Sequence, residues 1–258
     1  MTKFLRATLL ATAVLFANEA SAATALITGT NRGIGLEMVK QYADKGWTVI
    51  ATARKPSDAK DLNEVAGKYK KTVSVETLDV ANPDSIKALA TKLKGKPIDL
   101  LINNAGTLGD LPPQTVGTFQ KDTFETVLLT NVYGPLAVSE ALRENVAASQ
   151  GKKIVALTSG LGSATLTQRR GGMYAYRASK GALNVSMRAL AADLKPQGIV
   201  VGIVAPGMVE TDLLAASGYK GPALKVGESV AGLMKVIDGV TFETNDKAVN
   251  YNGDVIPW

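Results

Sequence analysis

Short apolar stretches alternate with longer stretches of helical periodicity along almost the whole chain. Strings of branched and aliphatic residues, which are typical of buried strands, predict strands at residues 24–28, 47–53, 73–78, 98–102, 153–158 and 199–204, with a candidate edge strand at 255–256. Elsewhere apolar residues recur at the spacing of one helix face. This pattern predicts helices at residues 34–45, about 58–70, from 83 onward, about 119–148, 174–194 and about 224–240.

The alternation of strand and helix predicts an α/β fold. We expect one doubly wound, Rossmann-like domain over residues 23–258, because no linker or internal repeat interrupts that range. Its central parallel sheet should have about seven strands, with helices on both faces. In folds of this kind ligands bind beyond the carboxyl ends of the strands. The loops that follow the strands are therefore where we expect the chemistry.

Residues 1–22 follow another pattern. Lys3 and Arg6 precede an apolar run over residues 7–17, and residues 20–22 read Ala-Ser-Ala, the small-residue pattern that signal peptidase accepts. The run is short for a transmembrane helix, so no membrane span is expected after cleavage. We interpret the segment as a secretory signal peptide and expect a periplasmic or secreted protein. A retained extension on a cytoplasmic protein is the alternative.

The chain of 258 residues contains no histidine and no cysteine. A Ser-His-Asp triad, a cysteine nucleophile, a His/Cys zinc site and a disulfide are therefore excluded. The net charge of +6 is spread along the chain with only short basic runs, so we expect no nucleic-acid partner. Any reaction must use the remaining polar side chains, with or without a cofactor.

A glycine-rich turn follows the first predicted strand and leads into the first predicted helix. It reads Thr-Gly-Thr-Asn-Arg-Gly-Ile-Gly over residues 28–35. Glycines permit a tight turn and a close approach of the backbone to a phosphate, and the N-terminus of the helix faces the anion. The turn predicts a nucleotide site, with candidate cofactor-binding residues Gly29, Asn31, Arg32, Gly33, Ile34 and Gly35.

The residues at the ends of the second and third strands indicate which nucleotide is bound. Sites that prefer NAD place an acidic residue after the second strand, whereas this chain has Arg54 there. Arg54 and Arg32 could clamp a 2′-phosphate, which favours NADP, with NAD as the alternative. Asp79, next to Val80, is a candidate acceptor for the adenine amine. Solvated arginines and a turn-capping aspartate are the competing interpretations.

Tyr176 and Lys180 are four residues apart within a predicted helix. That spacing places both side chains on one face. A free phenol has a pKa of about 10, so it becomes a useful acid or base near neutral pH only when a nearby cation favours its ionised form. An aromatic residue at the edge of the core beside a solvated lysine is the ordinary alternative.

Several motifs occur together in the order typical of one family. They are the turn at residues 28–35, Asn103-Asn104-Ala105-Gly106, Asn131, Ser159, Tyr176-xxx-Lys180, and Pro206-Gly207 followed by Thr211. With these motifs the chain from residue 24 onward resembles the short-chain dehydrogenases/reductases. Its ending, over residues 251–258, is similar to that of the C-factor and sniffer-type carbonyl reductase subgroup.

The resemblance implies a role for each motif. Tyr176 would be the acid/base, Lys180 would lower its pKa and bind the nicotinamide ribose, and Ser159 would bind the substrate carbonyl. Asn131 would hold a water that relays protons to Lys180. The remaining residues that the resemblance places at the cofactor are Asn104, Ala105, Gly106, Pro206, Gly207, Val209 and Thr211.

Two features depart from the family pattern. Ser159 lies 17 residues before Tyr176, a longer gap than usual, and Ser163 competes with it. We favour Ser159 because it directly follows an apolar strand. The extra residues fall in the loop over residues 160–172, which could shape the substrate pocket, although its arginine pair at 169–170 is more simply interpreted as solvated. An exported reductase would also have to find its nucleotide outside the cytoplasm.

The sequence thus predicts an enzyme: an NADP-preferring carbonyl reductase or alcohol dehydrogenase with a small-molecule substrate. An NAD(P)-binding, C-factor-like signalling protein with little turnover is the alternative from another class. Epimerisation at the same site is a third hypothesis. Substrate identity and reaction direction are not indicated, and the sequence is compatible with a homo-oligomer.

Overall fold

A sheet of eight strands forms the centre of the protein. The computed structural model describes residues 22–109, 114–167 and 171–258. The strands are β1 (Thr24–Ile27), β2 (Thr48–Ala53), β3 (Val73–Thr77), β4 (Leu100–Asn103), β5 (Lys153–Leu157), β6 (Val200–Ala205), β7 (Ala248–Asn250) and β8 (Val255–Ile256). Their order is β3-β2-β1-β4-β5-β6-β7-β8. All neighbouring strands are parallel except β7 and β8.

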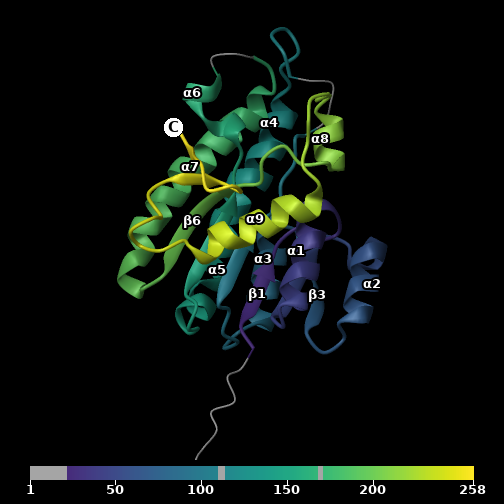
Figure 1. Cartoon of the computed structure of the whole chain (residues 1–258), viewed down its shortest axis with the longest axis vertical. Helices are drawn as coiled ribbons and strands as arrows, with labels where there is room; N and C mark the ends of the chain where they lie inside the picture. Colours follow the sequence, from purple (N-terminus) through teal and green to yellow (C-terminus); the bar gives the residue numbers. More distant parts are fainter. Residues whose placement is uncertain (1–21, 110–113, 168–170) are drawn as a thin grey trace, which may run out of the picture.

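Helices cover both faces of the sheet (Figure 1). The α-helices are α1 (Gly33–Asp44), α2 (Lys60–Lys68), α3 (Pro83–Lys92), α4 (Lys121–Leu128), α5 (Gly134–Ala147), α6 (Ala164–Thr167), α7 (Tyr174–Leu194), α8 (Asp212–Ala216) and α9 (Val226–Asp238). Buried apolar residues of α1, α2 and α9 contribute to one cluster, and buried apolar residues of α3, α5 and α7 contribute to a second. The predicted doubly wound α/β fold is confirmed.

Strand β1 illustrates how the sequence produces these two layers. Ala25 and Ile27 belong to the first apolar cluster, Leu26 belongs to the second, and all three side chains are fully buried. Successive side chains of a strand point to opposite faces, so a strand covered on both sides needs an uninterrupted apolar run. That run is the pattern from which the strand was predicted.

The structure differs from the prediction in four places. Strand β7 was not predicted, because three residues are too few to establish an alternation. The helix predicted over residues 119–148 is divided into α4 and α5 by a π-helical turn (Leu129–Tyr133). The loops after β5 and β6 contain the short helices α6 and α8. Short 3-10 helices occupy Pro56–Asp58, Gly160–Gly162 and Lys195–Gln197.

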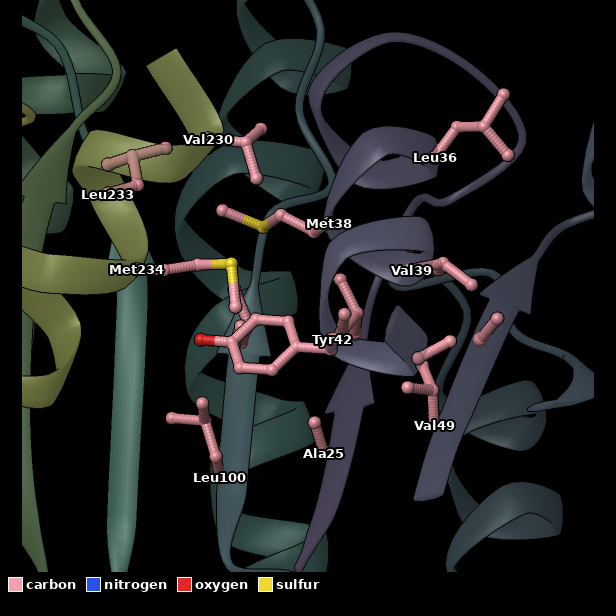
Figure 2. Packing of buried hydrophobic residues seen from close by; sticks show 14 of the residues in the cluster. Ala25, Leu36, Met38, Val39, Tyr42, Val49, Leu100, Val230, Leu233 and Met234 are labelled. Carbon is pink, nitrogen blue, oxygen red and sulfur yellow. The ribbon is translucent and has the colours of Figure 1, made fainter. Parts of the chain in front are cut away.

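Helices α1 and α9 pack side by side on the first face of the sheet. Met38 and Tyr42 of α1 meet Val230, Leu233 and Met234 of α9 (Figure 2). Burial is so complete around Tyr42 that it raises the pKa of the phenol, with the charge of Asp238 acting in the same direction. The apolar contact fixes the distance between the two helices.

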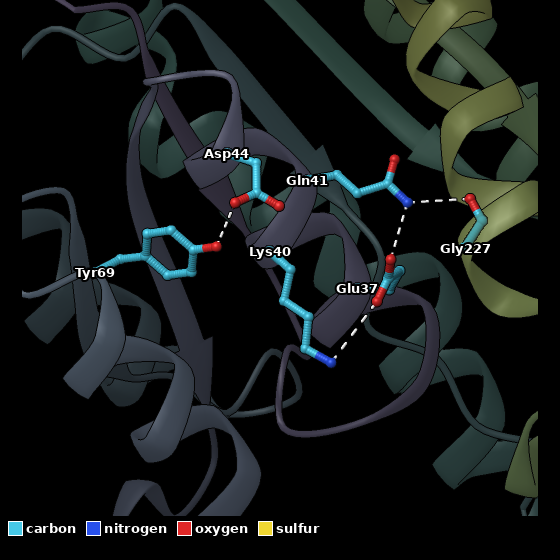
Figure 3. A network of polar contacts seen from close by, with 6 residues as sticks. All are labelled: Glu37, Lys40, Gln41, Asp44, Tyr69 and Gly227. Carbon is cyan, nitrogen blue, oxygen red and sulfur yellow. Dashed lines mark hydrogen bonds and ion pairs between the residues drawn. The ribbon is translucent and has the colours of Figure 1, made fainter.

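Polar contacts at the edge of this interface fix the register of the two helices (Figure 3). Gln41 Nε2 donates hydrogen bonds to Gly227 O at the start of α9 (3.0 Å) and to Glu37 Oε1 (2.9 Å). Glu37 also lies 3.7 Å from Lys40 Nζ. Because α1 begins at the glycine-rich turn, these contacts position that turn against the C-terminal third of the chain.

Some expectations fall outside the described residues. The expected signal peptide lies there except for Ala22, and so do Arg169 and Arg170 of the loop after β5. Among the helices of the described ranges, none combines the length and the apolar character that a bilayer crossing requires.

Candidate active site

The glycine-rich turn is packed directly against the loop that follows β4. Gly29 has a φ of +69°, and a Cβ at this position would lie 2.8 Å from the Ala105 Cα. A Cβ on Gly35 would lie 2.3 Å from Gly29 O and 2.5 Å from Asn104 Nδ2. These distances are too short for any side chain, so both glycines are required by the packing.

Hydrogen bonds join the same two loops. Thr28 Oγ1 accepts hydrogen bonds from the backbone N–H groups of Asn104 and Ala105, both at 3.0 Å. Asn104 Nδ2 donates to Thr28 O (2.8 Å) and Gly29 O (2.9 Å). Asn104, for which the family resemblance implies a place at the cofactor, therefore also holds the turn in position. The supporting role of Thr28 was not predicted. Its position directly after β1 is the signal that could have indicated it.

The N-terminus of α1 is open toward the carboxyl edge of the sheet. Within the described chain, Arg32 precedes the helix in an extended conformation without a side-chain cap, and the first turn has no acidic residue. The first N–H groups of a helix have no partner inside the helix and attract anions. Asn31, which precedes Arg32, is exposed. Ile34, in the first turn of the helix, is half-buried and packs on the first apolar cluster. This geometry suits a bound phosphate.

The two arginines predicted to select NADP lie at this edge. The Arg32 side chain is 71% exposed and lies 3.6 Å from the carboxylate of Asp212, which begins α8. Arg54 is exposed and directly follows β2. Both guanidinium groups are accessible to a ligand from solution. Their contact with a 2′-phosphate stays a prediction.

Asp79 forms the contacts of a turn-capping residue, which was the alternative to a role in binding adenine. Its Oδ1 accepts a hydrogen bond from Ala81 N (3.0 Å), and its own N–H donates to Ser85 Oγ (2.9 Å). Val80 is buried, and a Cβ on Gly134 would lie 2.9 Å from it. An additional contact of Asp79 with adenine stays a prediction.

Asn131 lies in the π-helical turn, where it is fully buried. Its Oδ1 accepts from Thr107 N (2.8 Å), and its Nδ2 donates to Thr107 O (2.9 Å) and Ser179 Oγ (3.0 Å). The carboxamide therefore ties the loop after β4 to α7. Thr107 and Ser179 were not predicted. The proposed water relay through Asn131 stays a prediction, and its side chain is already engaged with protein partners.

Tyr176 and Lys180 lie on one face of α7, as the spacing predicted. Tyr176 is 9% exposed and Lys180 is 5% exposed, and Lys180 Nζ lies 5.7 Å from the centroid of the Tyr176 ring. Lys180 Nζ also donates a hydrogen bond to Leu157 O at the end of β5 (2.8 Å). Burial lowers the pKa of Lys180 to about 8.

The pKa of Tyr176 differs from the expectation. Burial raises it to about 12, and a hydrogen bond with the Ser159 side chain offsets only part of this effect. Burial removes the water that would stabilise the ionised phenol. Lys180 does not make up for this loss, because its ammonium group is hydrogen-bonded to Leu157 O. We expected Lys180 to lower the pKa of Tyr176, but in the structure the net effect on this pKa is an increase. At neutral pH Tyr176 carries its proton.

The structure separates the two candidate serines. Ser159 Oγ accepts from Leu161 N (3.2 Å) and interacts with the Tyr176 phenol. Ser163 is buried, and its Oγ accepts from Leu166 N in the first turn of α6 (3.2 Å). Ser159 is thus the serine beside Tyr176, and Ser163 has a structural role.

The loop after β6 completes the site. Gly207 has a φ of +77°, and a Cβ there would lie 2.9 Å from the ring of Tyr251. Pro206 O accepts a hydrogen bond from Ser229 Oγ of α9 (2.6 Å). Val209 is buried and forms an isolated bridge with Leu224. The loop is therefore held by its neighbours at both ends.

Thr211 brings this loop to the glycine-rich turn. It caps α8 by accepting from Leu214 N (3.2 Å), and a Cβ on Gly33 would lie 3.5 Å from its Cγ2. It also lines an open surface pocket of about 690 Å³, together with residues that include Leu214, Tyr219 and Pro222. This pocket is a candidate space for part of a substrate or cofactor.

The residues present fit a dinucleotide. The turn at one end offers an uncapped helix N-terminus and exposed arginines, and the buried Tyr176 and Lys180 lie at the other. Gly106 lies between them, and a Cβ there would reach within 3.4 Å of Asn131 Oδ1 and 3.8 Å of Lys180 Nζ. Its lack of a side chain keeps the space in front of Lys180 open. Among the described residues no cluster could hold a metal ion.

Comparison with known proteins agrees with this geometry. Residues 23–220 match the family model described as short chain dehydrogenase. The chain is 34% identical over 173 residues to the C-signal of Myxococcus xanthus, covering 67% of this chain and 100% of that protein. An NADPH-bound carbonyl reductase from chicken fatty liver has a TM-score of 0.82 and 30% identity, over 92% of this chain and 99% of that one. The carbonyl reductase Sniffer of D. melanogaster has a TM-score of 0.82 and 29% identity, over 92% and 100%.

Proposed function

Because the chain belongs to the short-chain dehydrogenase family, and is therefore an NAD(P)-dependent oxidoreductase, we propose that it interconverts small carbonyl compounds and their alcohols with NADP(H). Tyr176 is the proposed proton donor and acceptor. The observation that carries the proposal is the buried, protonated phenol of Tyr176 beside Ser159, with Lys180 on the same helix face. A site with only a binding function would not need these three groups together.

Each residue of the site has a proposed part in the reaction. The nicotinamide cofactor supplies or accepts a hydride when bound. Tyr176 donates its proton to the substrate oxygen during reduction, and Ser159 donates a hydrogen bond to the same oxygen or orients the phenol. In the proposed reaction the positive charge of Lys180, 5.7 Å from the centroid of the Tyr176 ring, favours the phenolate left behind, although it does not offset the effect of burial on the pKa of Tyr176. Burial of this group of side chains excludes water and strengthens these interactions.

The cofactor would be held along the carboxyl edge of the sheet. The diphosphate would lie at the turn and the N-terminus of α1, and a 2′-phosphate would lie between Arg32 and Arg54. The nicotinamide end would lie near Gly106, Lys180 and the loop from Pro206 to Thr211. Exposed arginines in place of an acidic residue after β2 support NADP as the preferred form.

Assay of the purified protein with a panel of aldehydes, ketones and quinones tests the proposal. We expect substrate-dependent oxidation of NADPH, followed by its absorbance. Binding of NADPH without turnover of any carbonyl would instead favour the C-factor-like signalling role. Conversion of a substrate without net consumption of NADPH would favour epimerisation.

Replacing Arg32 or Arg54 with Ala is expected to weaken NADPH binding by about 10-fold to 150-fold each, because a charge-assisted hydrogen bond contributes about 1.5–3 kcal/mol. NADH lacks the 2′-phosphate, so its binding should change little. Fluorescence titration of both nucleotides measures the difference. Arg188→Ala, which removes an exposed arginine of α7, is the matched control for net charge. An equal loss of NADH affinity would show that the turn, not phosphate recognition, had been damaged.

The pH dependence of the two reaction directions should have opposite signs. Tyr176, with a pKa of about 12, carries its proton throughout the neutral range, so the proton donor for reduction is always present. Lys180, with a pKa of about 8, loses its charge as the pH rises through that value. We therefore expect kcat/KM for carbonyl reduction to fall above pH 8. For alcohol oxidation, which needs the phenolate, kcat/KM should rise with pH.

Initial rates measured in both directions across this range test the prediction. Thermal denaturation at each pH distinguishes a loss of chemistry from a loss of fold. A reduction rate that stays constant well above the pKa of Lys180 would contradict the assigned role of its ammonium group.

A further inference from the structure

The helix that carries Tyr176 and Lys180 begins without a cap from its own sequence. Met173, at the N-cap position of α7, has a φ of 56° and a ψ of 40°, and no side-chain cap is formed by this residue within the described structure. Left-handed backbone is unfavourable for a residue other than glycine. The first N–H groups of a helix also need partners from outside the helix. Something else must hold the start of α7.

Gln114 supplies the missing contacts from 61 residues away in the chain. Its Oε1 accepts a hydrogen bond from Ala175 N (2.5 Å), and its backbone O accepts from Met173 N (3.0 Å). Its Nε2 donates to Leu108 O (3.1 Å). The side chain is 5% exposed. Since one partner is a donor and the other an acceptor, the orientation of the amide is determined by the contacts.

These contacts place Gln114 in a ring of hydrogen bonds around Tyr176. On one side Gln114 holds the N–H of Ala175, the residue before Tyr176. On the other side Ser179 Oγ donates to Tyr176 O (2.7 Å) and accepts from Asn131 Nδ2. Asn131 binds both backbone groups of Thr107, and the next residue, Leu108, binds Gln114. The loop after β4 and the start of α7 are therefore held to each other twice.

We propose that Gln114 is a positioning residue for the reaction, and this inference rests on the proposed function. By fixing the first turn of α7 against the loop after β4, it sets the position of the Tyr176 phenol beside Ser159. Proton transfer is sensitive to displacements of about 1 Å, which can lower a rate by about 100-fold. Gln114 does not need to contact substrate or cofactor to have this effect.

Gln114→Met tests the proposal, because methionine has a similar length and shape but cannot form either side-chain hydrogen bond. We expect kcat to fall by about 10-fold to 100-fold, with little change in the affinity for NADPH. Hydrogen exchange of the Ala175 amide should become faster, because that N–H loses its partner. The exchange measurement does not depend on turnover.

Gln114→Glu is the conservative variant. A protonated carboxyl can accept from Ala175 N–H and donate to Leu108 O, whereas an ionised carboxylate cannot donate. Burial favours the protonated form. We therefore expect kcat of this variant, relative to the original protein, to be nearly restored at low pH and to fall as the pH rises.

Asn145→Leu is the matched control for a role in stability alone. Asn145 is another buried amide, and its Nδ2 donates to Leu93 O (2.6 Å) and Lys96 O (2.8 Å) at the opposite end of the sheet. This variant should lower the Tm without changing kcat or the exchange of the Ala175 amide.

The proposal is overturned if Gln114→Met keeps its kcat, or if Asn145→Leu lowers kcat to the same extent. If the original protein binds NADPH without turnover, the proposed function fails. Unchanged hydrogen exchange at Ala175 in Gln114→Met would then show that Gln114 does not hold the start of α7.

Discussion

Tyr176→Phe is expected to lower kcat for carbonyl reduction by about 1000-fold, because it removes the group that delivers the proton and leaves the rest of the site in place. The phenol is buried and protonated, and Ser159 is its polar partner. Phenylalanine fits the same space without leaving a cavity. We therefore expect the affinity for NADPH and the Tm to be nearly unchanged. Initial rates, nucleotide titration and circular dichroism measure these three properties.

Tyr174→Phe is the matched control, since it removes the same hydroxyl two residues earlier in α7. The Tyr174 ring is partly exposed and packs on Phe119 with a centroid distance of 4.9 Å, a contact that does not need the hydroxyl. Its kcat should be close to that of the original protein. Undiminished turnover in Tyr176→Phe would show that another group supplies the proton, and the assignment of Tyr176 would then be wrong.

Gly35→Ala is expected to destabilise the protein by roughly 2–4 kcal/mol, because the new methyl group would overlap backbone atoms of the turn. The added Cβ would lie 2.3 Å from Gly29 O and 3.0 Å from the Thr30 Cα. Relief of this overlap requires the turn to move away from Asn104, so NADPH binding should be lost as well. For a protein of this size the Tm should fall by roughly 5–15 °C.

Gly67→Ala provides the comparison for Gly35→Ala. Gly67 is exposed in α2, and apart from the backbone of its own helix no described atom lies within 4 Å of the position that its Cβ would occupy. Alanine is favoured over glycine inside a helix by roughly 0.5–1 kcal/mol, so this variant should be slightly more stable. Chemical denaturation of both variants gives the two free energies of unfolding. Equal stability of the two variants would mean that the turn has more room than the structure indicates.

The sequence predicted most of the fold because its buried strands are covered on both faces. Their apolar runs, as in Leu26 and its neighbours in β1, are visible without any knowledge of tertiary contacts. Strand β7 lacked this signal, because it is short and pairs near the edge of the sheet. The π-helical turn was not predicted, because the buried Asn131 within it has partners that are distant in the chain.

The structure brings together three residues that the sequence proposed for the site, Ser159, Tyr176 and Lys180, whereas the electrostatics of Tyr176 differ from the prediction. Spacing alone placed Tyr176 and Lys180 on one helix face, and the end of an apolar strand selected Ser159 over Ser163. Spacing does not report how much water surrounds a phenol, so the raised pKa of Tyr176 could not be predicted. Gln114 carried no signal at all, because a glutamine in a polar loop reveals its partners only after the chain has folded.

The pairing of α1 with α9 has a consequence for how the protein is made. The glycine-rich turn is synthesised early, yet the helix that follows it is anchored by Gln41 to Gly227, 186 residues later in the chain. A growing chain on the ribosome therefore lacks the partner that positions the turn until Gly227 has emerged. Contacts between such distant segments form slowly, because a long loop must close first. Nucleotide binding should thus be acquired only after α9 has been synthesised and has packed on α1.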